Sequence, residues 1–253
     1  MENIFNRIRN AITGRKQPRV VMRYPASRSG GANLQKPGRK AGSRLARPAY
    51  VWDRQKVVSH FESYFGPADD IIKDGSDIFI HIVKPTAEHN YFTFFTSGMS
   101  LNPMYVPQNM DGYEYAELMI HLPGDWPADE DGVEADWPVS WLRTLAHMPE
   151  DEKTWLFYGH TVPNGDDAAP FAENTELGCM ILGTTSLLES EEERNRFAML
   201  ELDKDNVVYC FTLYAIYKPE MDYKLEHAAQ DLFDLLASDG ACEIIDPWRR
   251  CVV

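Results

Sequence analysis

The sequence predicts an α+β fold, with a mixed β-sheet of about six strands and three or more helices packed on it. Short runs of aromatic and β-branched residues dominate the middle of the chain, whereas helical patterns occur at irregular intervals. A strict alternation of strand and helix, which indicates a doubly wound parallel sheet, does not occur. Hydrophobic residues make up 44% of the 253 residues, which is enough to build a packed core.

The charges divide the chain into two parts. Residues 1–50 contain twelve basic residues and one acidic residue, a net charge of +11, although the whole chain carries −14. Residues 51–253 therefore have a net charge of −25. Residues 14–48 are rich in Gly, Pro, Ser, Arg and Lys and lack the apolar surface that offsets the entropy of ordering. We expect residues 1–49 to form a basic, flexible arm and residues 50–253 to form the folded domain.

The folded domain is expected to begin with a helix. Asp53 suits the N-cap, and Gly66 followed by Pro67 ends the pattern. The apolar stripe between them consists of Val57, Val58, Phe61, Tyr64 and Phe65. Strand patterns bounded by turn residues then follow. They span residues 78–83, 91–96, 115–122, 155–158, 177–183 and 207–217.

Two more helices are expected after the first strands. One spans residues 138–147, because Pro138 suits a first helical turn and apolar residues recur behind it. The other runs from Pro219 to Gly240 as a single element, with acidic residues near its start that complement the helix dipole. Its expected buried stripe is Met221, Leu225, Ala228, Leu232, Leu235 and Leu236.

Residues that carry catalytic or metal-binding chemistry do not form a known motif. The seven histidines are dispersed, and His81 and His121, which lie in strand patterns, are expected to be surface or hydrogen-bonded core residues and not metal ligands. Without a GxSxG motif, Ser97 and Gly98 are expected to form a turn after a strand. Neither a P-loop nor GxGxxG occurs, and the acidic runs fit solvated loops or helix starts. We therefore expect no cofactor, no metal and no enzymatic activity.

The four cysteines are scattered and form no CxxC pair, which favours reduced thiols over a disulfide scaffold. The chain has no apolar run of about 18 residues and no apolar signal-peptide core. We expect a soluble, cytoplasmic protein without a membrane span. Apolar residues at helical spacing near the N-terminus also fit a transit peptide or a short membrane-surface or docking helix. These residues are Ile4, Phe5, Ile8 and Ile12.

Aromatic residues give one group of candidates for binding a partner. Trp126 and Trp137 each precede a proline beside acidic turns. They either pack a helix onto the sheet or line an aromatic groove for a peptide, since buried aromatic residues are common binding anchors. Tyr91, at the start of a strand pattern, and His160 are further candidates in this group.

The polar end of the chain gives the second group. Asp246, Trp248, Arg249 and Arg250 follow two isoleucines, and core packing alone does not require them. On an acidic domain the two arginines either pair with its own carboxylates or present a fork to acidic groups or carbonyls of a partner. Both alternatives remain open at this point.

Several blocks in this order resemble the Suppressor of fused family, in particular its single-domain bacterial members. The resemblance covers residues 51–250. It is carried by YFTFFTSGMS (91–100), YAELMIHLPGDWP (115–127), WPVSWLRTLAHMP (137–149), GHTVPNG (159–165), and YKPEMDYKLEHAAQDLFDLL (217–236) followed by IIDPWRR (244–250). The resemblance implies a mixed α/β domain that binds proteins and has no established catalysis.

Family knowledge also suggests partners. Animal members hold Gli-type transcription factors by using this domain with a second one, so that ligand does not transfer to a chain resembling the first domain alone. Bacterial relatives have been proposed as immunity proteins of toxin systems. Because of this and the acidic domain, the leading hypothesis is a non-catalytic interaction protein that neutralises a basic toxin.

Two alternatives belong to other classes of function. A hydrolase would use His160, Asn164 and nearby acids. A nucleic-acid-binding protein would use the basic residues of the arm, with an affinity that falls steeply with salt. The sequence leaves the oligomeric state and the identity of the partner open.

Overall fold

The computed structural model describes residues 54–73, 75–108, 110–126 and 136–253. The expected basic arm, the proposed N-cap Asp53 and the acidic residues at 129–131 lie outside these residues. Among the described helices, none is long and apolar enough to cross a membrane.

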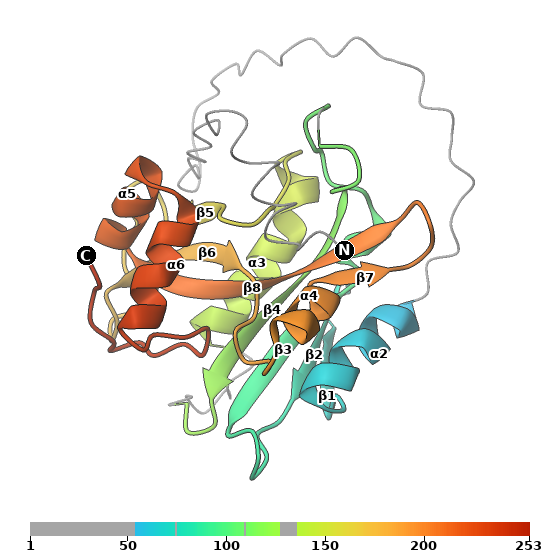
Figure 1. Ribbon diagram of the computed structural model, residues 1–253, viewed down its shortest axis with the longest axis horizontal. Coiled ribbons are helices and arrows are strands. Elements are labelled where there is room, and N and C mark those ends of the chain that lie inside the picture. Colours follow the sequence, from blue (N-terminus) through green and yellow to red (C-terminus); the bar gives the residue numbers. More distant parts are fainter. Residues whose placement is uncertain (1–53, 74, 109, 127–135) are drawn as a thin grey trace.

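The described residues form one eight-stranded mixed sheet with helices on both faces, which confirms the α+β prediction (Figure 1). The strand order is β1-β2-β3-β4-β8-β6-β5, and β7 pairs with β8 outside this path. The strands are β1 (Asp70–Lys73), β2 (Phe79–Val83), β3 (Tyr91–Ser97), β4 (Tyr115–Pro123), β5 (Thr161–Pro163), β6 (Leu177–Gly183), β7 (Met199–Glu201) and β8 (Val207–Tyr217). All neighbours pair antiparallel except β4 and β8, which are parallel.

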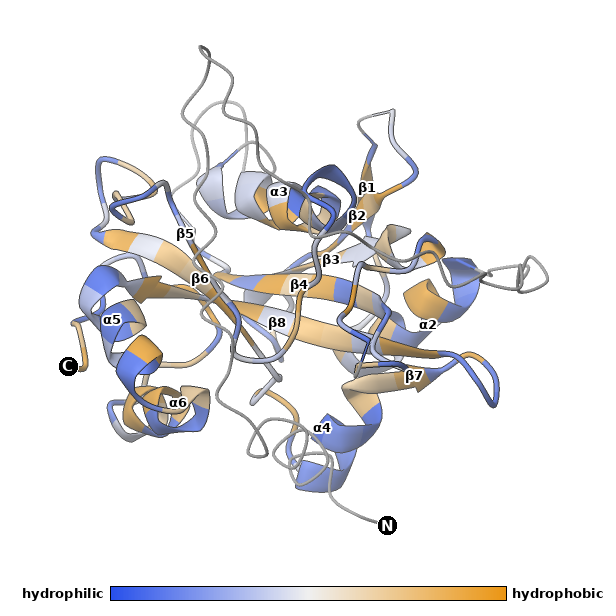
Figure 2. Ribbon diagram, turned by 90° about the horizontal axis from the view of Figure 1, so that it is seen from above, coloured by the Kyte–Doolittle hydropathy of each residue, from blue (hydrophilic) through white to orange (hydrophobic). Residues whose placement is uncertain are grey.

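Two helical layers cover the sheet. The helices are α2 (Arg54–Phe65), α3 (Trp137–Asp151), α4 (Glu191–Phe197), α5 (Lys218–Glu226) and α6 (Ala229–Ser238), and a short 3₁₀ turn spans Met99–Leu101. Figure 2 shows α3 on one side of the sheet and α4 and α6 on the other. Because side chains alternate along a strand, Phe94 belongs to the same core cluster as Leu142 of α3, whereas Phe95 stacks on Phe61 of α2 at 4.5 Å.

Five of the expected strands and the helix at residues 138–147 are confirmed, but residues 155–158 are not a strand. Leu156, Phe157 and Tyr158 are buried in the core without strand pairing. Their apolar character therefore reflects burial in a loop, which leads to Gly159 with a φ of +77°.

The single long helix expected from Pro219 to Gly240 is also wrong, because it divides into α5 and α6. His227 is extended, and the Asp231 carboxylate accepts the Ala228 N–H at 3.1 Å to cap a new helix. As a result Ala228 is exposed, although it was expected in the buried stripe. Gly240, with a φ of +78°, follows the end of α6 as expected.

Candidate protein-interaction surface

Residues 242–253, called the C-terminal segment below, close a gap in the sheet. β4 and β8 are paired only from Tyr115 with Val208 to Met119 with Thr212. Beyond that point β4 keeps β3 on one side, and its other side forms a parallel bridge from His121 to Ile244. The Ile245 N–H donates to the His121 carbonyl at 3.0 Å. The end of the chain is therefore attached to the sheet by backbone hydrogen bonds.

A buried ion pair holds the C-terminal segment against α5. Glu220 is fully buried, and its carboxylate accepts hydrogen bonds from Arg249 Nη1 at 2.7 Å and Nη2 at 2.6 Å. The backbone N–H groups of Tyr217 and Val252 donate to the same carboxylate at 2.9 and 3.0 Å. Arg249 Nη2 also donates to the Ala215 carbonyl at 3.1 Å. The guanidinium fork of Arg249 is thus engaged within the chain.

Trp248 projects from this fixed backbone. Its side chain is 65% exposed, whereas the preceding Pro247 is buried and accepts a hydrogen bond from Thr175 Oγ1 at 2.7 Å. The Trp248 N–H donates to Asp246 Oδ1 at 2.9 Å. Arg250 forms a forked ion pair with Asp239. Both arginines therefore pair with the domain's own carboxylates, and Trp248 is the exposed large hydrophobic side chain of the group.

A second buried carboxylate lies at the base of the C-terminal segment. Glu243 is fully buried and accepts hydrogen bonds from the Ser186 N–H at 2.7 Å, the Tyr214 hydroxyl at 3.1 Å, and the Thr185 and Ser186 hydroxyls. His121 Nε2 lies 4.0 Å from Glu243. Burial lowers the pKa of His121 to about 4, so this imidazole is neutral at pH 7 and the contact is not an ion pair.

Tyr91 lies near this buried cluster. Its ring packs edge-on against His121 at 5.5 Å, and His121 Nδ1 is 3.0 Å from the Thr93 hydroxyl. Burial, together with the charge of Glu243, raises the pKa of Tyr91. Tyr91 thus contacts His121, whose backbone bridges to Ile244, although Tyr91 and Ile244 are far apart in the sequence.

Trp126 and Trp137 pack together with their ring centroids 5.9 Å apart. Both contact Asp136, whose carboxylate accepts the Trp126 indole N–H and the Trp137 backbone N–H, each at 2.6 Å. Phe171 stacks on Trp137 at 4.8 Å and also contacts Trp141 at 4.9 Å. These rings anchor the start of α3, and Trp126 is only 8% exposed.

His160 lies apart from the C-terminal segment in the sequence and packs edge-on against Trp155 at 4.7 Å. Burial, helped by the charge of Lys224, lowers the pKa of His160 to about 4. Asn164 supports a turn by donating to the carbonyls of Ala169 and Pro170 at 2.9 and 3.0 Å. Within the described part of the chain, no group of three or more His, Cys, Asp or Glu residues is arranged to hold a metal ion.

The expected turn at Ser97 and Gly98 is built over a buried acid. Glu117 accepts hydrogen bonds from the Gly98 and Ser100 N–H groups at 2.9 and 3.0 Å and from the Thr96 and Ser100 hydroxyls at 2.6 Å each. Burial raises the pKa of Glu117. His81 lies 2.6 Å from the Ser97 hydroxyl, and both side chains are buried. His81 and His121 are therefore hydrogen-bonded core residues, as expected.

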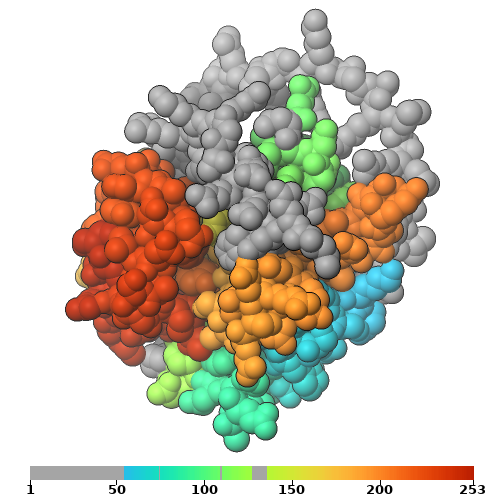
Figure 3. Space-filling model, in the orientation of Figure 1, coloured from blue at the N-terminus to red at the C-terminus, as the bar shows by residue number. Residues whose placement is uncertain are grey.

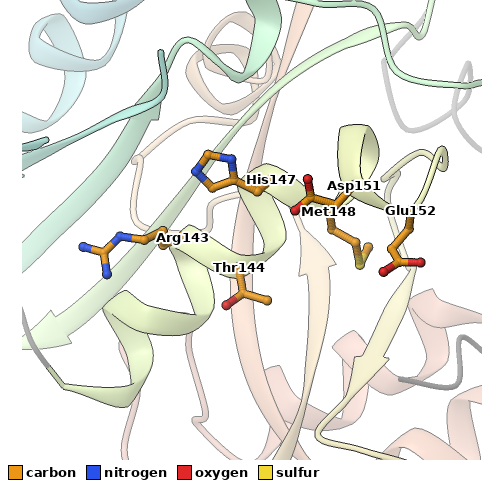
Figure 4. A pocket seen from close by; sticks show the side chains of 6 residues that line it. All are labelled: Arg143, Thr144, His147, Met148, Asp151 and Glu152. Atoms are coloured by element: carbon orange, nitrogen blue, oxygen red, sulfur yellow. The ribbon is translucent and has the colours of Figure 1, made fainter. Parts of the chain in front are cut away.

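One shallow hollow of about 300 Å³ lies along α3 and the residue that follows it (Figure 4). It is lined by Arg143, Thr144, His147, Met148, Asp151 and Glu152. None of these side chains was a candidate from the sequence, and the hollow contains none of the C-terminal residues.

The mixed sheet, the helices on both its faces and its C-terminal closure define an α+β domain. The family model for Suppressor of fused protein (SUFU) matches residues 74–250, and this chain belongs to the Suppressor of fused family. The match includes the predicted carriers of the resemblance from Tyr91 to Arg250. No curated protein sequence matches the chain.

Solved structures share the fold. A SUFU (suppressor of fused protein) homolog from Neisseria gonorrhoeae aligns with a TM-score of 0.54 and 19% identity, over 79% of this chain and 96% of that one. The Sufu–Fu complex contains a chain with a TM-score of 0.54 and 9% identity, over 78% of this chain and 91% of that one. Drosophila Suppressor of Fused aligns with a TM-score of 0.53 and 11% identity over 78% of this chain, which spans 50% of that protein.

Proposed function

We propose that this protein is a non-catalytic protein-interaction module that acts in the cytoplasm as a bacterial immunity protein and neutralises a basic toxin. Its family is a protein-binding family, and the Sufu–Fu structure is a complex of one structural neighbour with another protein. The choice of a basic partner rests on the net charge of −25 on residues 51–253.

This charge favours a basic partner for a physical reason. A surface with a large excess of one charge attracts the opposite charge within about one Debye length, which grows as salt falls, and so accelerates encounter. Affinity then depends on local contacts, because a long-range field contributes more to association than to the lifetime of a complex. We therefore expect a basic partner to bind rapidly and to depend on salt for its association rate.

Affinity capture from the native cell tests the proposal. The full chain carries a tag, the lysate is treated with nuclease to remove nucleic-acid bridges, and an unrelated protein of similar net charge serves as the control bait. We expect one basic protein to be retained by this chain and not by the control. A lysate that yields no specific protein at any salt concentration contradicts the interaction function.

Growth measurements test the toxin part separately. The captured protein is expressed alone and together with this chain in the same host. We expect arrested growth in the first case and restored growth in the second. A captured protein that does not affect growth leaves the interaction function in place and refutes toxin neutralisation.

A further inference from the structure

Trp248 is the exposed aromatic side chain of the C-terminal segment. Single exposed apolar residues are normal on protein surfaces, so exposure alone has no meaning. Trp248 differs because its neighbours are fixed: Pro247 is bound by Thr175, and Arg249 is bound by Glu220. A large aromatic side chain on an immobilised backbone loses little entropy on binding, which is a property of interface hot spots.

The charge around Trp248 indicates what binds there. Figure 3 shows α5, α6 and the C-terminal segment as one block on one side of the molecule. The segments at this end, residues 161–183 and 214–253, contain twelve acidic and four basic residues. Lys218, Arg249 and Arg250 are in ion pairs, and Lys224 is buried. The exposed charge at this end is therefore mainly negative.

Two exposed carboxylates neighbour Trp248, one in the sequence and one beside the residue that bonds Pro247. Asp246 is two residues away and exposed. Glu176 is exposed and follows Thr175, whose hydroxyl bonds Pro247 beside Trp248. An indole face attracts a cation within about 6 Å, and adjacent carboxylates accept hydrogen bonds from the same cation. The exposed ring and these acids together match the chemistry of a lysine or arginine side chain.

We propose that Trp248 is the anchor at which this domain captures a lysine or arginine side chain of a basic partner protein. The inference rests on the proposed function and specifies its contact. The cation lies over the indole, and Glu176 pairs with it from the loop that holds Pro247. Arginine suits the site better than lysine, because its planar guanidinium stacks on a ring while it donates to a carboxylate.

The test follows the indole N–H resonances of the full chain in ¹⁵N spectra, with Trp248→Phe identifying the signal. The probe is acetylated hexa-arginine amide, and a neutral Gly/Ser peptide is the control. We expect the Trp248 signal to shift with the arginine peptide only. Trp248→Ala should weaken binding about two- to five-fold, which corresponds to an exposed cation–π contact. Tyr105→Ala, at an aromatic residue whose ring already has Lys153 over it, should leave binding unchanged.

Any of four results would overturn the proposal. The first three are a Trp248 signal that does not move with the arginine peptide, equal binding by Trp248→Ala and Tyr105→Ala, and no effect of Glu176→Gln. The fourth is a Trp248 signal that changes with salt when no peptide is present, whereas we expect it to stay constant. A change like that caused by the peptide means that residues 1–49 occupy the site instead of a partner.

The captured protein separates this inference from the proposed function. If Trp248→Ala retains the captured partner with the affinity of the unaltered chain, Trp248 is not the anchor, although the chain still binds a protein. If no partner is captured but the arginine peptide still moves the Trp248 signal, the anchor stands and the proposed function fails.

Discussion

The two adjacent arginines of the C-terminal segment provide a sharp test of the structure. Arg249→Ala removes both hydrogen bonds to Glu220 and leaves this fully buried carboxylate without its cation. Breaking a buried ion pair costs about 3–5 kcal/mol. Because the Tyr217 and Val252 N–H groups still bind Glu220, we expect the lower end, about 3 kcal/mol.

Urea unfolding followed by circular dichroism measures this effect. With a slope of about 3 kcal/mol per molar urea, the midpoint should fall by about 1 M. Arg250→Ala is the matched control, because its ion pair with Asp239 has a 79% exposed arginine side chain and solvent screens it. Its midpoint should stay close to that of the unaltered chain. Equal midpoints for the two variants would refute the buried role of Arg249.

Three further predictions concern the rest of the domain. Gly98→Ala should disrupt the turn after β3, because a Cβ at this position would lie 2.1 Å from the Asp77 carbonyl oxygen. Gly75→Ala is the control, since a Cβ there meets no atom within 4 Å. Thermal melts compare the two variants, and equal melting temperatures would contradict the packing around Gly98. His121 has a folded pKa of about 4, so stability should fall as pH drops from about 6.5 to about 4, where only the unfolded state binds the proton. His121→Gln should reduce the slope of the urea midpoint against pH, to which His160 also contributes, and an unchanged slope would argue against a neutral buried imidazole at His121. Cys242 is exposed and should react with a thiol reagent in the native state. Cys179 is buried and its pKa is raised, so it should react only after unfolding. Mass spectrometry at successive times of reaction measures both rates.

The sequence predicted the long strands because burial and alternation are local signals. β4 and β8 were found within one residue of their bounds. β5 has three residues and contains Pro163, and β7 also has three, so neither produces a pattern long enough to identify. The capping box of Ser190 and Glu193 is a local signal for α4, although no helix was predicted over residues 191–197.

The C-terminal surface was only partly predictable. The sequence left open whether the arginines pair within the domain, and the structure answers this because α5 brings Glu220 to Arg249 across 29 positions. No local pattern encodes that contact. Buried acids such as Glu117 and Glu243 were missed for the same reason, since their hydrogen-bond donors come from other strands and loops.

The most direct test of the protein-interaction function is binding between the purified full chain and the purified captured protein, measured by surface plasmon resonance at low and high salt. We predict a direct complex whose association rate falls as salt rises, while its dissociation rate changes much less. Absence of direct binding between the two pure proteins would contradict it.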